Sequence, residues 1–205
     1  GARAVTDIVL GFGEVGSALG EVLRERYTVG AVDIAKGLDT LEKMNCDWMH
    51  VCFPYSDSFR AAVLVYAVQL APRRIIIHST VPMGTTREIA AAVPRTTKVF
   101  YSPVRGIHPH IARYLREFPK WYASEWRGPA DAEFADHFGR CGIQVRRAPS
   151  TDALELMKLW ETTEYGYRIA MWQELEREIA TLPGSGEENL TAMKAWLFEK
   201  RKVYD

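Results

Sequence analysis

Short apolar runs alternate with segments of helical spacing from the start of the chain to Pro149. The runs are rich in Val and Ile, which is typical of strands buried on both faces of a parallel sheet. Helical spacing between the runs predicts helices that include Glu14–Arg26 and Ser56–Leu70. This alternation predicts an α/β fold with a doubly wound, mostly parallel sheet. The predicted strands are Ala4–Leu10, Thr28–Val32, Trp48–Phe53, Arg74–His78, Lys98–Tyr101, Lys120–Glu125 and Ile143–Val145.

The pattern changes at Pro149, where the alternation of strands and helices ends. Ser150 or Thr151 can cap a helix, and no strong helix breaker appears as far as Leu182. This stretch is predicted to form one long amphipathic helix, followed by a short final helix over Glu187–Lys202. The apolar positions that recur at three- and four-residue steps along the long helix are Met157, Trp160, Tyr167, Met171, Leu175 and Ile179.

A glycine-rich turn joins the first predicted strand to the first predicted helix in the sequence VLGFGEVGSALG, which begins at residue 9. In a strand–GxGxxG–helix context, Gly11 permits a tight turn, Gly13 lets a pyrophosphate approach the backbone, and Gly16 lets helix and strand pack closely. The next strand leads to Asp33, which suits the ribose hydroxyls of NAD, while the nearby Lys36 keeps NADP as an alternative. This context predicts a Rossmann-type domain that binds NAD. The cofactor-binding residues predicted here are Gly11, Phe12, Gly13, Glu14, Val15, Gly16 and Asp33.

Two regions follow from these patterns. Residues 1–149 are predicted to form the NAD-binding domain, and residues 150–205 a helical segment for dimerisation and substrate binding. The apolar stripe on Asp152–Leu182 is longer than one small domain can cover, so we expect a homodimer built on this helix. Packing against the chain's own last helix is the alternative, and it would cover part of the stripe.

The charge balance, the apolar stretches and the cysteines limit what this chain can bind and where it can reside. The 205 residues carry 26 Lys and Arg against 26 Asp and Glu, which gives no general attraction to nucleic acid or to an anionic membrane. There is no apolar stretch of membrane-spanning length and no signal-peptide pattern, so we expect a cytoplasmic protein. The scattered cysteines Cys46, Cys52 and Cys141 argue against a disulfide framework and against a zinc site.

The loop YSPVRGIHPH, which begins at Tyr101, follows a predicted strand and carries Arg105, His108 and His110. A guanidinium is suited to clamp a carboxylate or phosphate, and a histidine can move a proton near neutral pH. We therefore predict that Arg105 and His108 contact a small anionic substrate. A proline-rich connection with ordinary surface histidines is the alternative. No nearby third ligand accompanies the two histidines, so no metal site is predicted.

Two longer segments resemble a known family. The segment HSTVPMGTT, which begins at His78, is similar to the STVPxGTT segment of the UDP-glucose/GDP-mannose dehydrogenase family. The segment ELMKLWETTEYGYRIAMWQEL, which begins at Glu155, is similar to that family's central helix. The sequence VCFPYSD resembles the family's strand that ends in V-P-T, which is altered here by Phe53, Pro54 and Tyr55. More distantly, SPVRG at Ser102 is similar to a segment of the β-hydroxyacid dehydrogenases.

The resemblance implies further site residues. Lys158 falls at the family's catalytic lysine, and Thr162, where the family has Asn, lies one turn further on the same helix face. Tyr165 falls near that face and is expected to contact substrate. Phe53, Pro54, Ser79 and Thr80 are expected at the cofactor, with Thr80 and Ser102 also facing the substrate. Each role has a structural alternative. The segment that holds Ser79 and Thr80 can be a turn in which Thr85 and Thr86 cap the next helix. Lys158 can be a solvated lysine that pairs with Glu155 or Glu161.

The predicted activity is hydride transfer between NAD and an alcohol or oxo group of an anionic substrate, related to a sugar nucleotide or a hydroxy acid. The family's cysteine motif, GGxCxPKD, does not occur in these residues, so the cysteine-dependent second oxidation is not expected. Two alternatives stay open. One is an NAD(H)-binding sensor or regulatory module without turnover, and the other is an oxidative decarboxylase or reductase that uses the same cleft.

Overall fold

A computed structural model describes residues 6–39, 46–126 and 128–204. The contacts of the chain separate two units, Gly1–Leu159 and Trp160–Asp205, and each is described by itself. The boundary lies within α6 (Thr151–Ala180), and the second unit begins at Trp160, ten residues after the predicted start of the helical segment at residue 150.

The first unit is built on a sheet of eight strands in the order β3-β2-β1-β4-β5-β6-β7-β8. The five central strands β2, β1, β4, β5 and β6 are parallel to one another. By contrast, β3 runs antiparallel to β2, and β7 runs antiparallel to β6. The order reverses between β1 and β4, which is the switch point of a doubly wound sheet. The strands are β1 (Thr6–Leu10), β2 (Thr28–Asp33), β3 (Leu38–Asp39), β4 (Trp48–Val51), β5 (Arg74–Ile77), β6 (Lys98–Tyr101), β7 (Lys120–Ser124) and β8 (Val145–Arg147).

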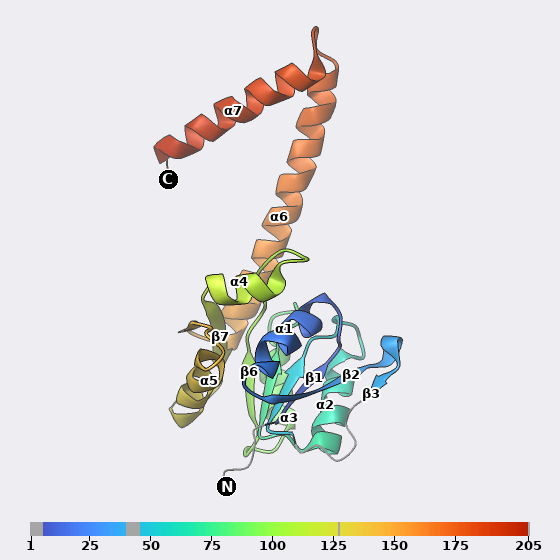
Figure 1. The fold of residues 1–205 in the computed structure, drawn as a ribbon, viewed down its shortest axis with the longest axis vertical. Helices are drawn as coiled ribbons and strands as arrows, with labels where there is room; N and C mark the ends of the chain where they lie inside the picture. Colours follow the sequence, from blue (N-terminus) through green and yellow to red (C-terminus); the bar gives the residue numbers. More distant parts are fainter. Residues whose placement is uncertain (1–5, 40–45, 127, 205) are drawn as a thin grey trace. The chain divides into compact units, whose positions relative to one another are not determined.

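Helices cover both faces of this sheet, and this confirms the predicted α/β, doubly wound architecture (Figure 1). The helices α1, α4 and α5 pack on one face, whereas α2, α3 and the first turns of α6 pack on the other. The sequence pattern did not bound α4 and α5. The helices of the first unit are α1 (Glu14–Arg24), the 3₁₀ turn η1 (Ile34–Lys36), α2 (Phe59–Leu70), α3 (Thr85–Ala92), α4 (Ile111–Glu117) and α5 (Pro129–Gly139).

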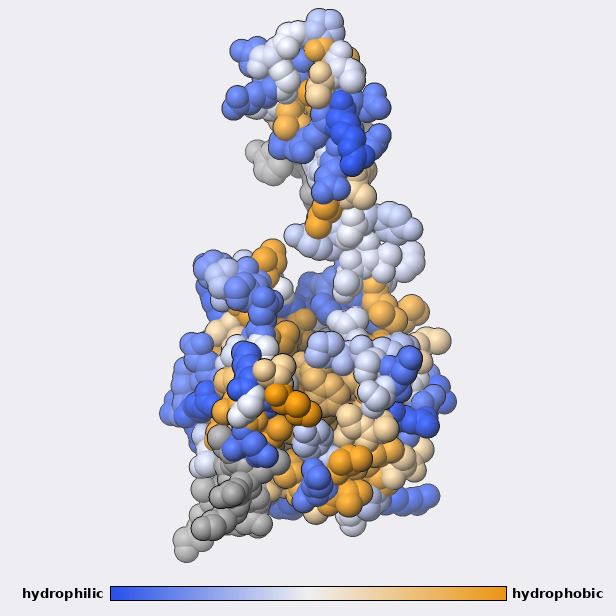
Figure 2. All heavy atoms as spheres, turned by 90° about the vertical axis from the view of Figure 1, so that its right-hand side faces the viewer, coloured by the Kyte–Doolittle hydropathy of each residue, from blue (hydrophilic) through white to orange (hydrophobic). Residues whose placement is uncertain are grey.

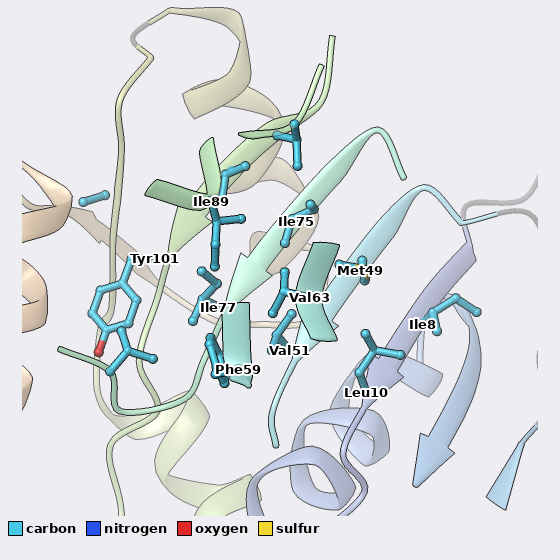
Figure 3. Packing of buried hydrophobic residues seen from close by; sticks show 14 of the residues in the cluster. Ile8, Leu10, Met49, Val51, Phe59, Val63, Ile75, Ile77, Ile89 and Tyr101 are labelled. Carbon is cyan, nitrogen blue, oxygen red and sulfur yellow. The ribbon is translucent and has the colours of Figure 1, made fainter. Parts of the chain in front are cut away.

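Alternation along the strands assigns side chains to the two faces. Ile8, Leu10, Met49 and Val51 belong to one buried cluster, together with side chains of α2 and α3 (Figure 3). Trp48, which directly precedes Met49 on β4, belongs to the other cluster, with the apolar residues of α1, α4 and α5. Some predicted bounds change. The last strand is Val145–Arg147 instead of Ile143–Val145, because Ile143 packs in the core of the second cluster before the ladder to β7 begins.

The second unit contains the later turns of α6 and the helix α7 (Gly186–Tyr204). Within it, Ile179 is buried, and the Lys194 ammonium lies 3.7 Å from a Glu176 carboxylate oxygen and 5.9 Å from the Trp172 ring centroid. The chain's own last helix therefore lies against the C-terminal part of the predicted stripe. Trp160, Tyr167 and Met171 remain exposed. Hydrophobic residues lie among hydrophilic ones on the surface of this unit (Figure 2).

Candidate dinucleotide site

The glycine turn is fixed by two close approaches of the backbone. Gly11 has φ +85°, and a Cβ there would lie 2.6 Å from the Phe53 backbone nitrogen. A Cβ on Gly16 would lie 1.9 Å from the Gly11 carbonyl oxygen. Neither position accepts a larger residue without backbone movement. The turn therefore holds the end of β1, the start of α1 and the end of β4 in one arrangement.

Gly13 differs from these two glycines. Among the described residues, nothing lies within 4 Å of a Cβ built on Gly13. Gly13 is also the N-cap of α1, and no side-chain hydrogen bond caps this helix. The first backbone N–H groups of a helix have no partner within the helix, and together they carry partial positive charge. This helix end is consequently open to an anion.

Asp33, at the end of β2, holds the same turn from the other side. Its Oδ2 accepts a hydrogen bond from the Phe12 backbone N–H at 2.7 Å, and its Oδ1 accepts one from the Lys36 backbone N–H at 3.1 Å. The Lys36 ammonium in turn donates to the Phe12 carbonyl oxygen at 2.6 Å. A carboxylate oxygen can accept more than one hydrogen bond, so Asp33 is oriented and still able to accept from a ligand hydroxyl.

A cavity of about 560 Å³ opens between these elements at the switch point of the sheet. Of the predicted cofactor residues, those that line it are Gly11, Gly13, Glu14, Val15, Asp33, Phe53 and Pro54. Sequence reasoning missed its apolar wall, which includes Ile34, Ala35, Ala62 and Tyr66. Ile34 is exposed, and its position directly after Asp33 was the signal available in the sequence. A cavity of similar volume, about 590 Å³, lies between the C-terminal ends of α2 and α3 and holds none of the predicted residues.

Ser79 and Thr80 follow β5 at the same edge of the sheet. The Ser79 hydroxyl donates to the Phe53 carbonyl oxygen at 2.6 Å, which ties the end of β5 to the end of β4. Thr80 is exposed. Neither residue belongs to those that line the 560 Å³ cavity, and their predicted contacts with the cofactor and the substrate stay predictions.

Capping of the next helix by Thr85 and Thr86 was the structural alternative for the GTT sequence. The N-cap of α3 is instead Gly84, with φ +93°, and the capping oxygens come from Glu155 of α6. Glu155 is fully buried and accepts hydrogen bonds from the Gly84 N–H at 2.6 Å and from the N–H and hydroxyl of Thr86 at 2.8 and 2.6 Å. The two segments that carried the family resemblance are therefore joined by one carboxylate.

The loop after β6 approaches the glycine turn. His108 Nδ1 lies 3.8 Å from a carboxylate oxygen of Glu14, the first residue of α1. The Arg105 guanidinium lies over the Phe118 ring at 5.4 Å, and both Arg105 and His108 are exposed. This places the two predicted substrate contacts on a loop beside the open helix end.

The other predicted contacts lie elsewhere. Ser102 is fully buried, and its hydroxyl donates to the Trp121 carbonyl oxygen at 2.7 Å, so it points into the interior. Lys158 is half-buried in the first unit, while Thr162 and Tyr165 are exposed residues of the second unit. The roles of these four residues stay predictions.

No protein-family model matches the sequence, and no curated protein matches it. Solved structures with a similar fold include a UDP-D-ManNAc dehydrogenase from Pyrococcus horikoshii, with a TM-score of 0.72, 17% identity, and coverage of 90% of this chain and 56% of that one. A reductive aminase from Aspergillus terreus in complex with NADPH and ethyl levulinate has a TM-score of 0.68, 12% identity, and coverage of 98% and 75%. A 3-hydroxyisobutyrate dehydrogenase from Mycobacterium tuberculosis has a TM-score of 0.63, 14% identity, and coverage of 88% and 68%.

At these identities the likeness shows the fold alone. The fold is of the Rossmann type, as the glycine turn and the strand alternation predict, and its likeness extends to dehydrogenases related to both families that the sequence resembles. The chain spans 56% of the length of the Pyrococcus enzyme. Within the described residues, no helix is both long enough and apolar enough to cross a membrane.

Proposed function

We propose that this chain binds NAD and takes part in hydride transfer to or from an alcohol or oxo group of a small anionic substrate. The observation that supports the proposal most is the open N-terminus of α1 at Gly13, which faces a cavity of about 560 Å³ beside Asp33. A bound nicotinamide would supply the hydride acceptor or donor. Residues of the chain would bind both molecules and would hold or move the proton.

The donors and acceptors around the cavity suit a dinucleotide. The N–H groups at the start of α1 would hold the pyrophosphate, because the helix end carries partial positive charge and Gly13 leaves room for close approach. Asp33 would accept hydrogen bonds from the adenosine ribose and would repel a 2′-phosphate, which favours NAD over NADP. The apolar wall formed by Ile34 and Tyr66 suits a flat ring.

The substrate side of the proposal rests on a loop and a helix. Arg105 would bind an anionic group of the substrate, and His108, whose Nδ1 lies 3.8 Å from a Glu14 carboxylate oxygen, would hold or move a proton. Lys158 is proposed as the acid–base group at the substrate oxygen, on the strength of the sequence resemblance. Residues 1–149 would then be the NAD-binding domain, and residues 150–205 the segment for dimerisation and substrate binding.

We also propose that the chain forms a homodimer through α6. Trp160, Tyr167 and Met171 are 71%, 74% and 61% exposed, and helical spacing puts all three on one face of α6. Large apolar side chains that share a helix face are a frequent component of interfaces between copies of a chain.

Titration with NADH and NADPH, together with the Gly13→Ala variant, tests cofactor binding. A methyl group at Gly13 meets no described atom of the chain, so the variant should fold normally while its Cβ occupies the approach of the pyrophosphate. We expect at least an about tenfold loss of NADH affinity, measured by isothermal titration calorimetry. Gly139→Ala is the matched control, because its Cβ also meets open space, at the end of α5, and it should bind NADH like the wild type.

Failure of the wild-type chain to bind either nucleotide would contradict the site. Equal or tighter binding of NADPH would contradict the role of Asp33 and leave the glycine turn in place.

Lys158→Met tests turnover. A substrate must first be found. Mass spectrometry would identify a ligand that co-purifies with the chain. A panel of nucleotide sugars, hydroxy acids and oxo acids would then be screened by the change in NADH absorbance. Loss of a positioned acid–base group then costs about a hundred- to ten-thousandfold in rate, while NADH affinity should stay unchanged. Arg105→Ala should mainly raise KM. A fully active Lys158→Met variant would contradict the scheme, and NADH binding without turnover on any substrate would favour the sensor alternative.

A further inference from the structure

Three titratable side chains meet in the interior of the first unit, away from the cavity described above. Asp7 of β1, His50 of β4 and His137 of α5 are all buried on the sheet face that α1, α4 and α5 cover. Asp7 Oδ1 lies 2.7 Å from His50 Nε2 and 2.9 Å from His137 Nε2. One oxygen and two imidazole nitrogens therefore lie within 4.8 Å of one another.

Counting protons along the neighbouring contacts shows that no neutral set of histidine tautomers satisfies all of them. His78 Nδ1 lies 2.8 Å from the Ser102 carbonyl oxygen, and since a carbonyl only accepts, Nδ1 carries the proton. A neutral His78 then presents an unprotonated Nε2 to His50 Nδ1 at 3.0 Å, so His50 Nδ1 must donate. A neutral His50 consequently turns an unprotonated Nε2 toward the Asp7 carboxylate at 2.7 Å. Two lone pairs at that distance repel each other unless a cation lies with them.

The reverse set of tautomers leaves a different contact unsatisfied. It gives His50 Nε2 the proton for the 2.7 Å contact with Asp7, and it has Lys120 donate to His78 Nδ1 at 3.3 Å. It leaves the unprotonated His78 Nδ1 at 2.8 Å from the Ser102 carbonyl oxygen, so two acceptors face each other there. Each neutral set therefore leaves one contact shorter than 3 Å without a proton.

Two further atoms of the cluster lack partners. Within the described part of the chain, Asp7 Oδ2 and His137 Nε2 are buried with no assigned hydrogen-bond partner, and His137 Nε2 lies 2.9 Å from Asp7 Oδ1. A buried polar atom without a partner is unfavourable and needs an explanation. An extra proton on His50 would relieve one contact, at the cost of charging a ring that is fully removed from water. A metal ion would satisfy all of these atoms together.

We propose that Asp7, His50 and His137 bind a divalent transition-metal ion, with Zn²⁺ as the best match. Two imidazoles and one carboxylate are ligands that Zn²⁺ accepts in tetrahedral sites, and Asp7 Oδ2 or a water would take the fourth position. Zinc–ligand bonds of about 2.0–2.2 Å separate tetrahedral ligand atoms by about 3.3 Å, so the Asp7 and imidazole atoms need to spread by only about half an ångström.

The surroundings orient the ligands as a metal site requires. The chain of contacts through His78 to the Ser102 carbonyl oxygen can accept the Nδ1 proton of His50, which leaves His50 Nε2 unprotonated as a metal-bound histidine needs. The His137 ring is stacked between Trp48 at 4.2 Å and Tyr27 at 4.3 Å. His137 also lines a surface cavity of about 270 Å³, which gives an ion a route to the cluster. The bound ion would connect β1, β4 and α5.

The test uses the full chain, first treated with a chelator and then titrated with Zn²⁺ and with Co²⁺. We expect one ion per chain, the visible absorption of four-coordinate Co²⁺, and a higher melting temperature with Zn²⁺ than with chelator. His137→Gln should weaken Zn²⁺ binding by at least about tenfold. His110→Gln is the matched control, because it removes an exposed histidine outside the cluster, and it should bind like the wild type.

A wild-type chain that takes up neither ion overturns the proposal, and this result does not depend on any variant. Wild-type affinity in a folded His137→Gln variant overturns it as well. Loss of binding in His110→Gln would assign the ion to the surface loop and would also overturn it. If His137→Gln fails to fold, Asp7→Asn replaces it, with the same expected loss.

Discussion

At the scale of single residues, burial decides which side chains can react. Cys46 and Cys141 are buried and Cys52 is half-buried. Burial raises the pKa of the Cys46 and Cys52 thiols to about 12 and the pKa of the Cys141 thiol to about 11. Only the thiolate is a good nucleophile, and almost none is present near neutral pH at such pKa values.

We therefore expect Cys52→Ser and Cys141→Ser to keep NADH binding and turnover. In the native wild-type chain, all three thiols should react with iodoacetamide more slowly near neutral pH than after unfolding, because unfolding returns each pKa to its ordinary value. Labelling followed by mass spectrometry measures these rates. A cysteine variant that folds and binds NADH but has no turnover would refute the scheme without a cysteine nucleophile.

At the scale of elements, Glu155 shows how α6 and α3 depend on each other. Its carboxylate serves three donors at the N-terminus of α3, and it is supplied from a helix far along the chain. Burial raises the pKa of Glu155, and the hydrogen bonds from Thr86 and Gly84 oppose that rise. The start of α6 is thus held against the segment that follows β5.

The isosteric variant Glu155→Gln should lower the free energy of unfolding by about 1–3 kcal/mol, because its NH2 group would replace one acceptor oxygen and face a backbone N–H donor. Urea denaturation measures the change. Glu21→Gln, at an exposed position of α1, is the control and should change stability by less than about 0.5 kcal/mol. Equal stability of the two variants would show that the hydrogen bonds of Glu155 do not stabilise the fold.

At the scale of the whole molecule, the exposed apolar residues of α6 bear on the assembly of two chains. The Ile179 end of the apolar stripe is covered within the second unit, whereas Trp160, Tyr167 and Met171 stay exposed. A second copy of the chain would cover such a face symmetrically.

Met171→Asp should therefore weaken dimerisation, because it would bury a charge in the proposed interface. Gln173→Asp is the matched control, since residue 173 is exposed on the opposite side of α6 and should leave association unchanged. Light scattering over a range of micromolar concentrations measures both. A monomeric wild-type chain at these concentrations would rule the dimer out.

By itself, the sequence determined the features that depend on neighbours along the chain. Apolar runs and helical spacing predicted most strands and helices, and the GxGxxG turn with Asp33 predicted where a cavity opens, because a strand, a turn and a helix start are local patterns. Gly11 and Gly16 are needed for close backbone approaches that the motif already encodes.

Only the tertiary structure decided which distant side chains meet. Ser102 was expected at the substrate, yet it faces the interior, because the pairing of β6 with β5 and β7 sets its direction. Asp7, His50 and His137 carry no motif, and they meet because β1, β4 and α5 place them on one face of the sheet. Strand order and register set such encounters, and neither is written in the spacing of residues along the chain.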